Sequence, residues 1–84
     1  MTNWPNWWNW ELRLSDHVLT RMEQRHFNEA ELRAMLEDSS AVFPAADPGR
    51  WLVATRFRGA SWNVVLEPDM ADAIVVVVTA FELF

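Results

Sequence analysis

The chain has no cysteine, no lysine and no tyrosine, and only two glycines among its 84 residues. Without cysteine it can form no disulfide, offers no thiolate nucleophile and has no sulfur ligand for a metal. With two glycines it contains no Gly-rich loop of the kind that cradles phosphates. These absences exclude cysteine chemistry and P-loop nucleotide binding, and they agree with an intracellular location.

A long hydrophobic run is also missing. The longest, over residues 73–81, is interrupted by Thr79 and is far shorter than the roughly 20 apolar residues that span a bilayer. The chain does not open with the basic stretch and apolar run of a secretory signal. We therefore expect a cytoplasmic protein with no membrane partner.

Positive charge is scarce, since twelve acidic residues oppose seven arginines and give a net charge of −5. Proteins that live on nucleic acid usually carry a basic footprint. This balance argues against tight non-specific binding and leaves a local arginine patch as the route to an anion. His17 and His26 stand at no recognised metal-ligand spacing, so we expect no metal site and no other cofactor.

What the chain does have is tryptophan, with four of its six tryptophans between residues 4 and 10. From Trp8 to Leu14 apolar and polar residues alternate, which predicts a strand with Trp8 and Trp10 on its buried face. We therefore interpret residues 1–84 as a single domain, in which a Trp-rich segment, 1–7, precedes a core over residues 8–81.

Trp4 and Trp7 lie ahead of the alternating pattern and are interface candidates. An exposed pair of indoles would be an unfavourable patch on a monomer, so they could mediate homo-oligomerisation or bind a protein partner. Alternatively, they could cap the sheet within one molecule. Stacking on nucleic-acid bases contributes about 1–3 kcal/mol per base but normally comes with positive charge, which this segment lacks.

The remaining pattern predicts an α+β domain. Ser15 reads as the N-cap of a first helix and Asn28 as the capping-box residue of a second, over Glu29 to about Asp38. We expect these two helices, both in the N-terminal half, to pack on one face of a three- to five-stranded antiparallel sheet. Its later strands are expected at Ala41–Phe43, Trp51–Phe57, Trp62–Leu66 and Ile74–Val78.

The residues best suited to chemistry are His17, Arg21 and Arg25, spaced i, i+4 and i+8 on the first helix. A histidine exchanges protons near neutral pH, and arginines hold phosphate through paired hydrogen bonds. The alternative is a solvated helix face on which the arginines pair with neighbouring acids. Arg56 and Arg58 share parity on one strand and could bind the same anion, or could be solubilising charges.

The run SDHVLTRMEQRHFNEAELRAML, followed by NVVLEP and IVVVVTAF, resembles a family of small bacterial domains with a His-x-x-x-Arg-Met-x-x-Arg motif. That family is similar in layout to the BrnT toxins and, more remotely, to RelE-type ribonucleases of toxin–antitoxin pairs. The resemblance covers Leu12 to Ala80. It implies a RelE/BrnT-like fold, RNA as substrate, an antitoxin partner and metal-independent endonucleolytic cleavage.

Under this resemblance, His17 is the general acid or base, and Arg21 and Arg25 bind the phosphate. A second hypothesis is a non-catalytic interaction or regulatory module of the same fold, which acts through the Trp-rich strand and the acidic surface. The net negative charge and the missing lysine and tyrosine favour this second hypothesis.

Overall fold

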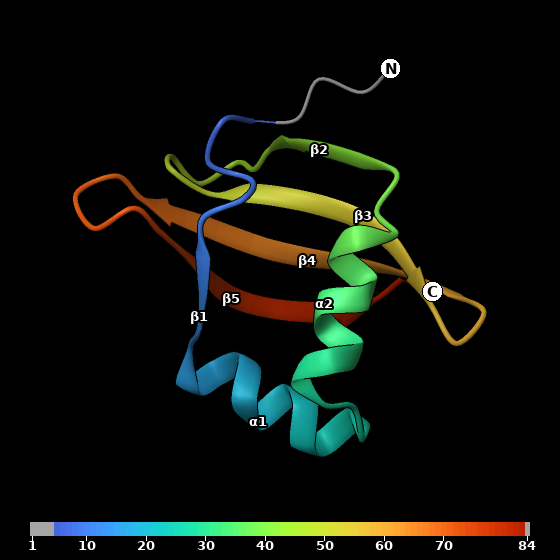
Figure 1. Cartoon of the computed structure of the whole chain (residues 1–84). Coiled ribbons are helices and arrows are strands. Elements are labelled where there is room, and N and C mark those ends of the chain that lie inside the picture. The colour runs from blue at the N-terminus through green and yellow to red at the C-terminus, as the bar shows by residue number, and fades with distance from the viewer. Residues whose placement is uncertain (1–4, 84) are drawn as a thin grey trace.

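The computed structural model describes residues 5–83, which form two helices and five strands in the arrangement of Figure 1. The elements in chain order are β1 (Glu11–Leu14), α1 (Asp16–Arg25), α2 (Glu29–Glu37), β2 (Ala41–Pro44), β3 (Trp51–Phe57), β4 (Ala60–Asp69) and β5 (Ile74–Glu82). The predicted α+β class is confirmed, and β3 has the bounds that alternation predicted.

The sheet has the order β1-β5-β4-β3-β2 and is mixed. Strands β2 to β5 are antiparallel neighbours, but β1 pairs with β5 in parallel, with Leu12 opposite Val75 and Leu14 opposite Val77. The prediction of an antiparallel sheet was therefore wrong. Alternation in the sequence shows that a strand has one buried face, but it does not show the direction of its neighbour.

Ser15 joins β1 to α1 and fixes the start of the helix. Its Oγ accepts a hydrogen bond from the backbone N–H of Val18 at 3.0 Å and donates one to the carbonyl of Val78 at 2.8 Å. The predicted N-cap is confirmed, and the same hydroxyl ties the helix to β5. Because Ser15 directly follows β1 and is bonded to β5, α1 begins at the edge of the sheet where β1 and β5 pair in parallel.

The joint between the helices is equally well defined. His26 adopts a left-handed conformation with φ 58° and ends α1, as the C-terminal residue of a helix commonly does. Asn28 then accepts from the N–H of Glu31 at 2.8 Å, while the Glu31 carboxylate accepts from the N–H of Asn28 at 3.0 Å. This reciprocal pair is the predicted capping box.

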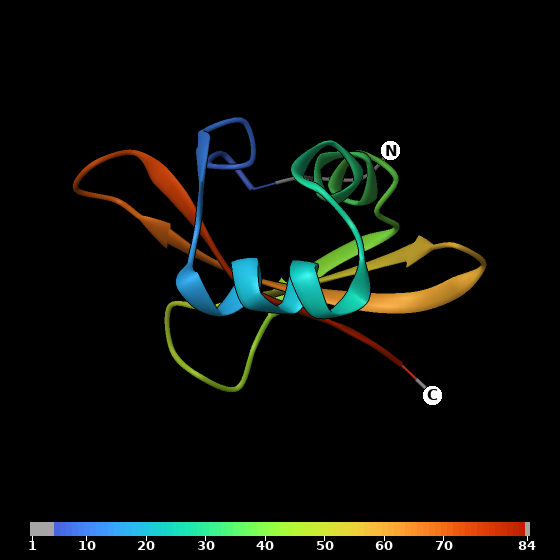
Figure 2. The same ribbon diagram turned by 90° about the horizontal axis from the view of Figure 1, so that it is seen from below.

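Both helices bury their apolar residues in one cluster against the same side of the sheet. Figure 2 shows α2 above the sheet, with no helix of the described chain on the side below. Phe27, Phe57 and Trp62 form an aromatic triad in this cluster, with ring centroids 5.6–5.9 Å apart. The hydroxyl of Thr55, on the same side of β3, donates a hydrogen bond of 2.5 Å to the carbonyl of Met35. This bond links α2 to the sheet.

Strands β4 and β5 are longer than the predicted Trp62–Leu66 and Ile74–Val78. β3 begins at Trp51, which pairs with Leu66, so β4 has no β3 neighbour beyond Leu66 and is an edge strand there. Proline is tolerated on an edge strand, and Pro68 therefore does not end β4. A register shift at Val65 and Leu66 lets the two strands stay paired along their length.

Neither α1 nor α2, the helices of residues 5–83, has the length and apolar character that a membrane-spanning helix needs.

Candidate functional site

The predicted residues His17, Arg21 and Arg25 all lie on α1 at one-turn intervals, so their side chains leave the helix on neighbouring positions of one face. We call these three residues the α1 stripe. His17 and Arg25 are exposed, whereas Arg21 is half-buried and its Nε is enclosed without a hydrogen-bond acceptor among the described residues. A buried donor without a partner is uncommon in folded proteins, but this Nε is enclosed and is therefore not itself exposed to a ligand from solvent.

The ion pairs of the described chain use side chains other than those of this stripe. Arg33 lies 3.8 Å from Glu29 along α2, Arg50 lies 3.2 Å from Glu67, and Arg58 lies 3.1 Å from Glu31. None of these contacts involves the α1 stripe. The alternative predicted that Arg21 and Arg25 pair with neighbouring acids. Within residues 5–83 the structure shows no such ion pair.

Arg56 stays apart from the stripe, whereas Arg58 reaches the C-terminal end of α1, where its Nη1 donates to the carbonyl of Arg25 at 3.5 Å. The Nη2 of Arg56 donates to the carbonyl of Gly59 at 3.0 Å within its own hairpin. The Nη2 of Arg58 donates to the carbonyl of His26 at 2.8 Å as well as contacting Glu31. Arg58 therefore holds the hairpin against the joint between the helices.

Arg56 and Arg58 are two positions apart, which predicts side chains on the same side of one strand. This does not hold, because β3 ends at Phe57, between the two arginines. Arg58 and Gly59 form the tight turn, both with positive φ, and a turn of this kind breaks the alternation of a strand. The Arg-Gly dipeptide was the available signal for this turn. It predicts the change of backbone direction but not the docking of the arginine onto α1.

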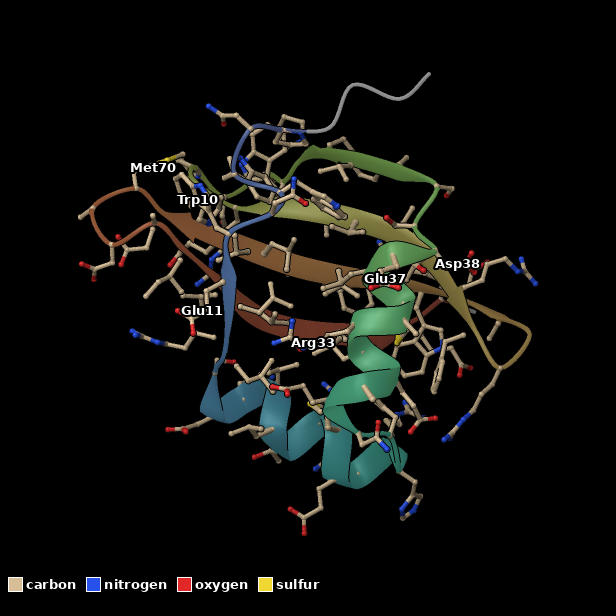
Figure 3. The ribbon with its side chains drawn as sticks, viewed as in Figure 1. Trp10, Glu11, Arg33, Glu37, Asp38 and Met70 are labelled. Carbon is tan, nitrogen blue, oxygen red and sulfur yellow. The ribbon has the colours of Figure 1, made fainter. Side chains whose placement is uncertain are left out.

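A hollow of about 220 Å³ lies at the Trp-rich segment, between the chain ahead of β1 and the exposed side of α2. Figure 3 shows Trp10 from this segment, and Arg33 and Glu37 from α2, on the side of the sheet that carries the helices. Sequence reasoning missed Arg33 and Glu37, because they come from an element far from the tryptophans in the chain. The residues that line the hollow are Trp7, Trp8, Asn9, Trp10, Leu12, Arg33, Leu36, Glu37, Leu66 and Val75.

The tryptophans themselves divide into a buried and a half-buried group. Trp7 is 3% exposed and packs edge-on against Trp51 at a centroid distance of 5.5 Å, so it belongs to the core and presents no exposed indole. Trp8 and Trp10 are half-buried against the same cluster, and both precede β1, which begins at Glu11 rather than at Trp8. Trp4, the other interface candidate, lies outside the described residues.

No three histidine, aspartate or glutamate side chains of residues 5–83 come together in a group that could hold a metal ion. The site therefore rests on the α1 stripe and the hollow at the tryptophans. Comparisons with protein-family models, curated proteins and solved structures found no match to this chain.

Proposed function

We propose that the chain is a small RNA-cleaving protein of the toxin type, with a RelE/BrnT-like fold, that binds phosphodiester groups along the α1 stripe without a metal. The observation that carries the proposal is that the stripe stays unpaired within residues 5–83 of an acidic chain. Three of the seven arginines are engaged by carboxylates, and none of the three stripe residues is. An anionic ligand finds there positive charge that no described carboxylate neutralises.

The chemistry proposed for the stripe is transesterification within the RNA. His17 takes the proton of a ribose 2′-hydroxyl as that oxygen attacks the adjacent phosphorus. The bond from phosphorus to the 5′-oxygen breaks, and the imidazolium returns its proton to the leaving oxygen. The products are a 2′,3′-cyclic phosphate and a 5′-hydroxyl, while Arg21 and Arg25 stabilise the charge on the phosphoryl oxygens.

The test combines cleavage and binding of a single-stranded RNA in the presence of a chelator. His17→Ala should lower the cleavage rate by about 10²–10⁴-fold with little change in RNA affinity. Arg21→Ala should weaken binding and reduce the slope of log K against log salt by about 0.7, the share of one phosphate contact.

Arg33→Ala is the matched control, because Arg33 is also a helical surface arginine but is paired with Glu29 outside the stripe. It should leave both cleavage and the salt slope unchanged. Wild-type protein that neither binds nor cleaves RNA, free or on ribosomes, contradicts the proposal. So does an Arg33→Ala defect as large as that of Arg21→Ala.

The hollow favours a second candidate function, a protein-interaction module. Its lining mixes tryptophan and aliphatic side chains with Asn9, Arg33 and Glu37, which suits a partner segment that offers an apolar side chain beside polar groups. Panning a random peptide library separates the candidates. Peptides that share an apolar anchor and bind the wild type but not Trp10→Ala support the module, whereas no enrichment counts against it.

A further inference from the structure

The side of the sheet turned away from the helices carries no charged residue at its centre. Val53 and Thr55 point into the cluster under the helices, so alternation along β3 turns Leu52 and Ala54 to the opposite side. Directly paired residues of antiparallel strands share a face, so the register extends this side across β2, β4 and β5. We call it the open face, and its central residues are Ala41, Phe43, Leu52, Ala54, Asn63, Val65, Thr79 and Phe81.

A sheet face that meets water is normally polar, yet the centre of this one carries no charge. Its charged side chains lie at the periphery, with Glu11 and Arg13 on β1, Arg56 near the end of β3 and Glu67 on β4 beyond the first residue of β3. Phe43 is 41% exposed, whereas Val65 is only 9% exposed and the Thr79 hydroxyl is enclosed, so the chain itself covers part of this face, on the side where the segment between β2 and β3 runs (Figure 2). An apolar centre within a charged rim is the usual anatomy of a protein interface.

The size of the open face suits a partner of comparable area. Five strands at about 4.8 Å spacing and a ten-residue central strand bound the face at about 20 Å by 30 Å, although β1 and β2 have only four residues each. At most, that extent reaches the lower end of a standard interface, in which each partner buries about 800 Å². Monomers rarely expose contiguous apolar patches larger than a few hundred Å².

The residue pattern of the open face identifies the partner, because it is complementary to itself. One row across the strands reads Phe43, Leu52, Val65, Thr79, and the next row reads Ala41, Ala54, Asn63, Phe81. Each large residue of one row has a smaller neighbour on the same strand in the other row, except where Val65 meets Asn63 of similar size. A two-fold axis that runs between the rows sets Phe43 against Ala41, Leu52 against Ala54, and Phe81 against Thr79 of another molecule.

We propose that two copies of this chain pair through their open faces about this two-fold axis to form a four-layer homodimer, helices outside and sheets inside. Interfaces of this isologous type bring residue i against residue j and residue j against residue i, which is the relation between Leu52 and Ala54 here. The proposal does not depend on RNA cleavage, because α1 packs Val18 and Met22 into the cluster on the helix side of the sheet, and the hollow is lined by Leu66 and Val75 of that same side.

Sedimentation equilibrium tests the pairing directly. The wild type should sediment at twice the 9.8 kDa chain mass, and Leu52→Glu should sediment as a folded monomer because it places a charge at the centre of the interface. Leu19→Glu is the matched control, since Leu19 is an exposed leucine, 46% accessible, on α1. If Leu52→Glu fails to fold by circular dichroism, Phe43→Glu on the short edge strand β2 gives the same test.

A pair of compensating variants tests the register. Leu52→Ala leaves a hole opposite Ala54 of the partner, and Ala54→Leu overfills the space opposite Leu52, so each should weaken the dimer by at least about tenfold. The double variant Leu52→Ala/Ala54→Leu exchanges the two side chains across the axis and should recover the wild-type dissociation constant. A wild type that stays monomeric up to millimolar concentration overturns the proposal, as does a double variant no tighter than the single ones.

Discussion

Both sides of the sheet carry apolar residues, but the two sides differ in how those residues are used. On the covered side, valine, leucine and aromatic side chains interdigitate with α1 and α2 and become inaccessible. On the open face, Leu52, Ala54 and Phe81 meet no helix of the described chain and stay half-buried. Apolar content alone therefore does not identify the core, because the helices decide which side is packed within the molecule.

Leucine occurs on both sides, which allows the largest predicted difference to be measured with one kind of substitution. Leu66→Ala removes a side chain that is 1% exposed on the covered side, and we expect it to lower the free energy of unfolding by about 2–5 kcal/mol. Leu52→Ala on the open face should cost less than about 1.5 kcal/mol in the monomer, because water already reaches that side chain.

Urea denaturation at two protein concentrations measures this contrast and also tests the dimer. The Leu66→Ala defect should persist at every concentration. The Leu52→Ala defect should grow as concentration rises, because the wild type gains stability from association that the variant lacks. Equal losses for the two variants at low concentration would show that the open face is as well packed as the covered one.

Two threonines sharpen the same comparison with a smaller effect. The hydroxyl of Thr55 is buried and donates to the Met35 carbonyl, so Thr55→Val leaves that carbonyl without its partner and should cost about 1–3 kcal/mol. The hydroxyl of Thr79 lies on the other side, is enclosed and has no partner within the described residues. Thr79→Val should therefore be neutral or stabilise the fold by up to about 1 kcal/mol.

Thermal and urea unfolding of both valine variants, followed by circular dichroism, checks the opposite signs. Both substitutions exchange a hydroxyl for a methyl group on a strand, so strand propensity is matched. Destabilisation by Thr79→Val comparable with that of Thr55→Val would mean that the Thr79 hydroxyl has a partner that residues 5–83 do not supply.

Local features were predictable from the sequence because the residues that decide them are neighbours in the chain. Ser15 and Asn28 cap the two helices as expected, since each cap bonds to a backbone N–H three residues ahead. The alternation from Trp51 to Phe57 gave β3 its bounds for the same reason. The spacing of His17, Arg21 and Arg25 likewise fixed the α1 stripe on one helix.

Long-range features were not predictable, because distant residues decide them. The parallel pairing of β1 depends on β5, which follows some sixty residues later, and the hollow appears only when α2 brings Arg33 and Glu37 to the tryptophans. The burial of Trp7 depends on Trp51 in the same way. The open face was hidden as well, because a strand with apolar residues on both sides, such as β5, reads as central rather than as half uncovered.

The smallest predicted difference concerns the two arginines of the β3–β4 hairpin. Arg58 bonds to the end of α1 and to Glu31 on the covered side, and its guanidinium lies 4.6 Å above the Phe57 ring. Because the Arg58 side chain is about half exposed, its removal should cost only about 0.5–1 kcal/mol. Arg56 contacts only the carbonyl of Gly59 in its own turn, so Arg56→Asn should change the free energy of unfolding by less than about 0.5 kcal/mol.

Asparagine is the better replacement for both arginines, because Arg58 has a φ of 51° and asparagine tolerates this conformation. Chemical denaturation at low and high salt then isolates the ionic part. The Arg58→Asn defect should shrink in high salt as the Glu31 contact is screened, while Arg56→Asn should show no salt dependence. If the two variants instead lose the same stability with the same salt response, the hairpin is held by its strands alone, and Arg58 is free to bind an anion beside Arg25.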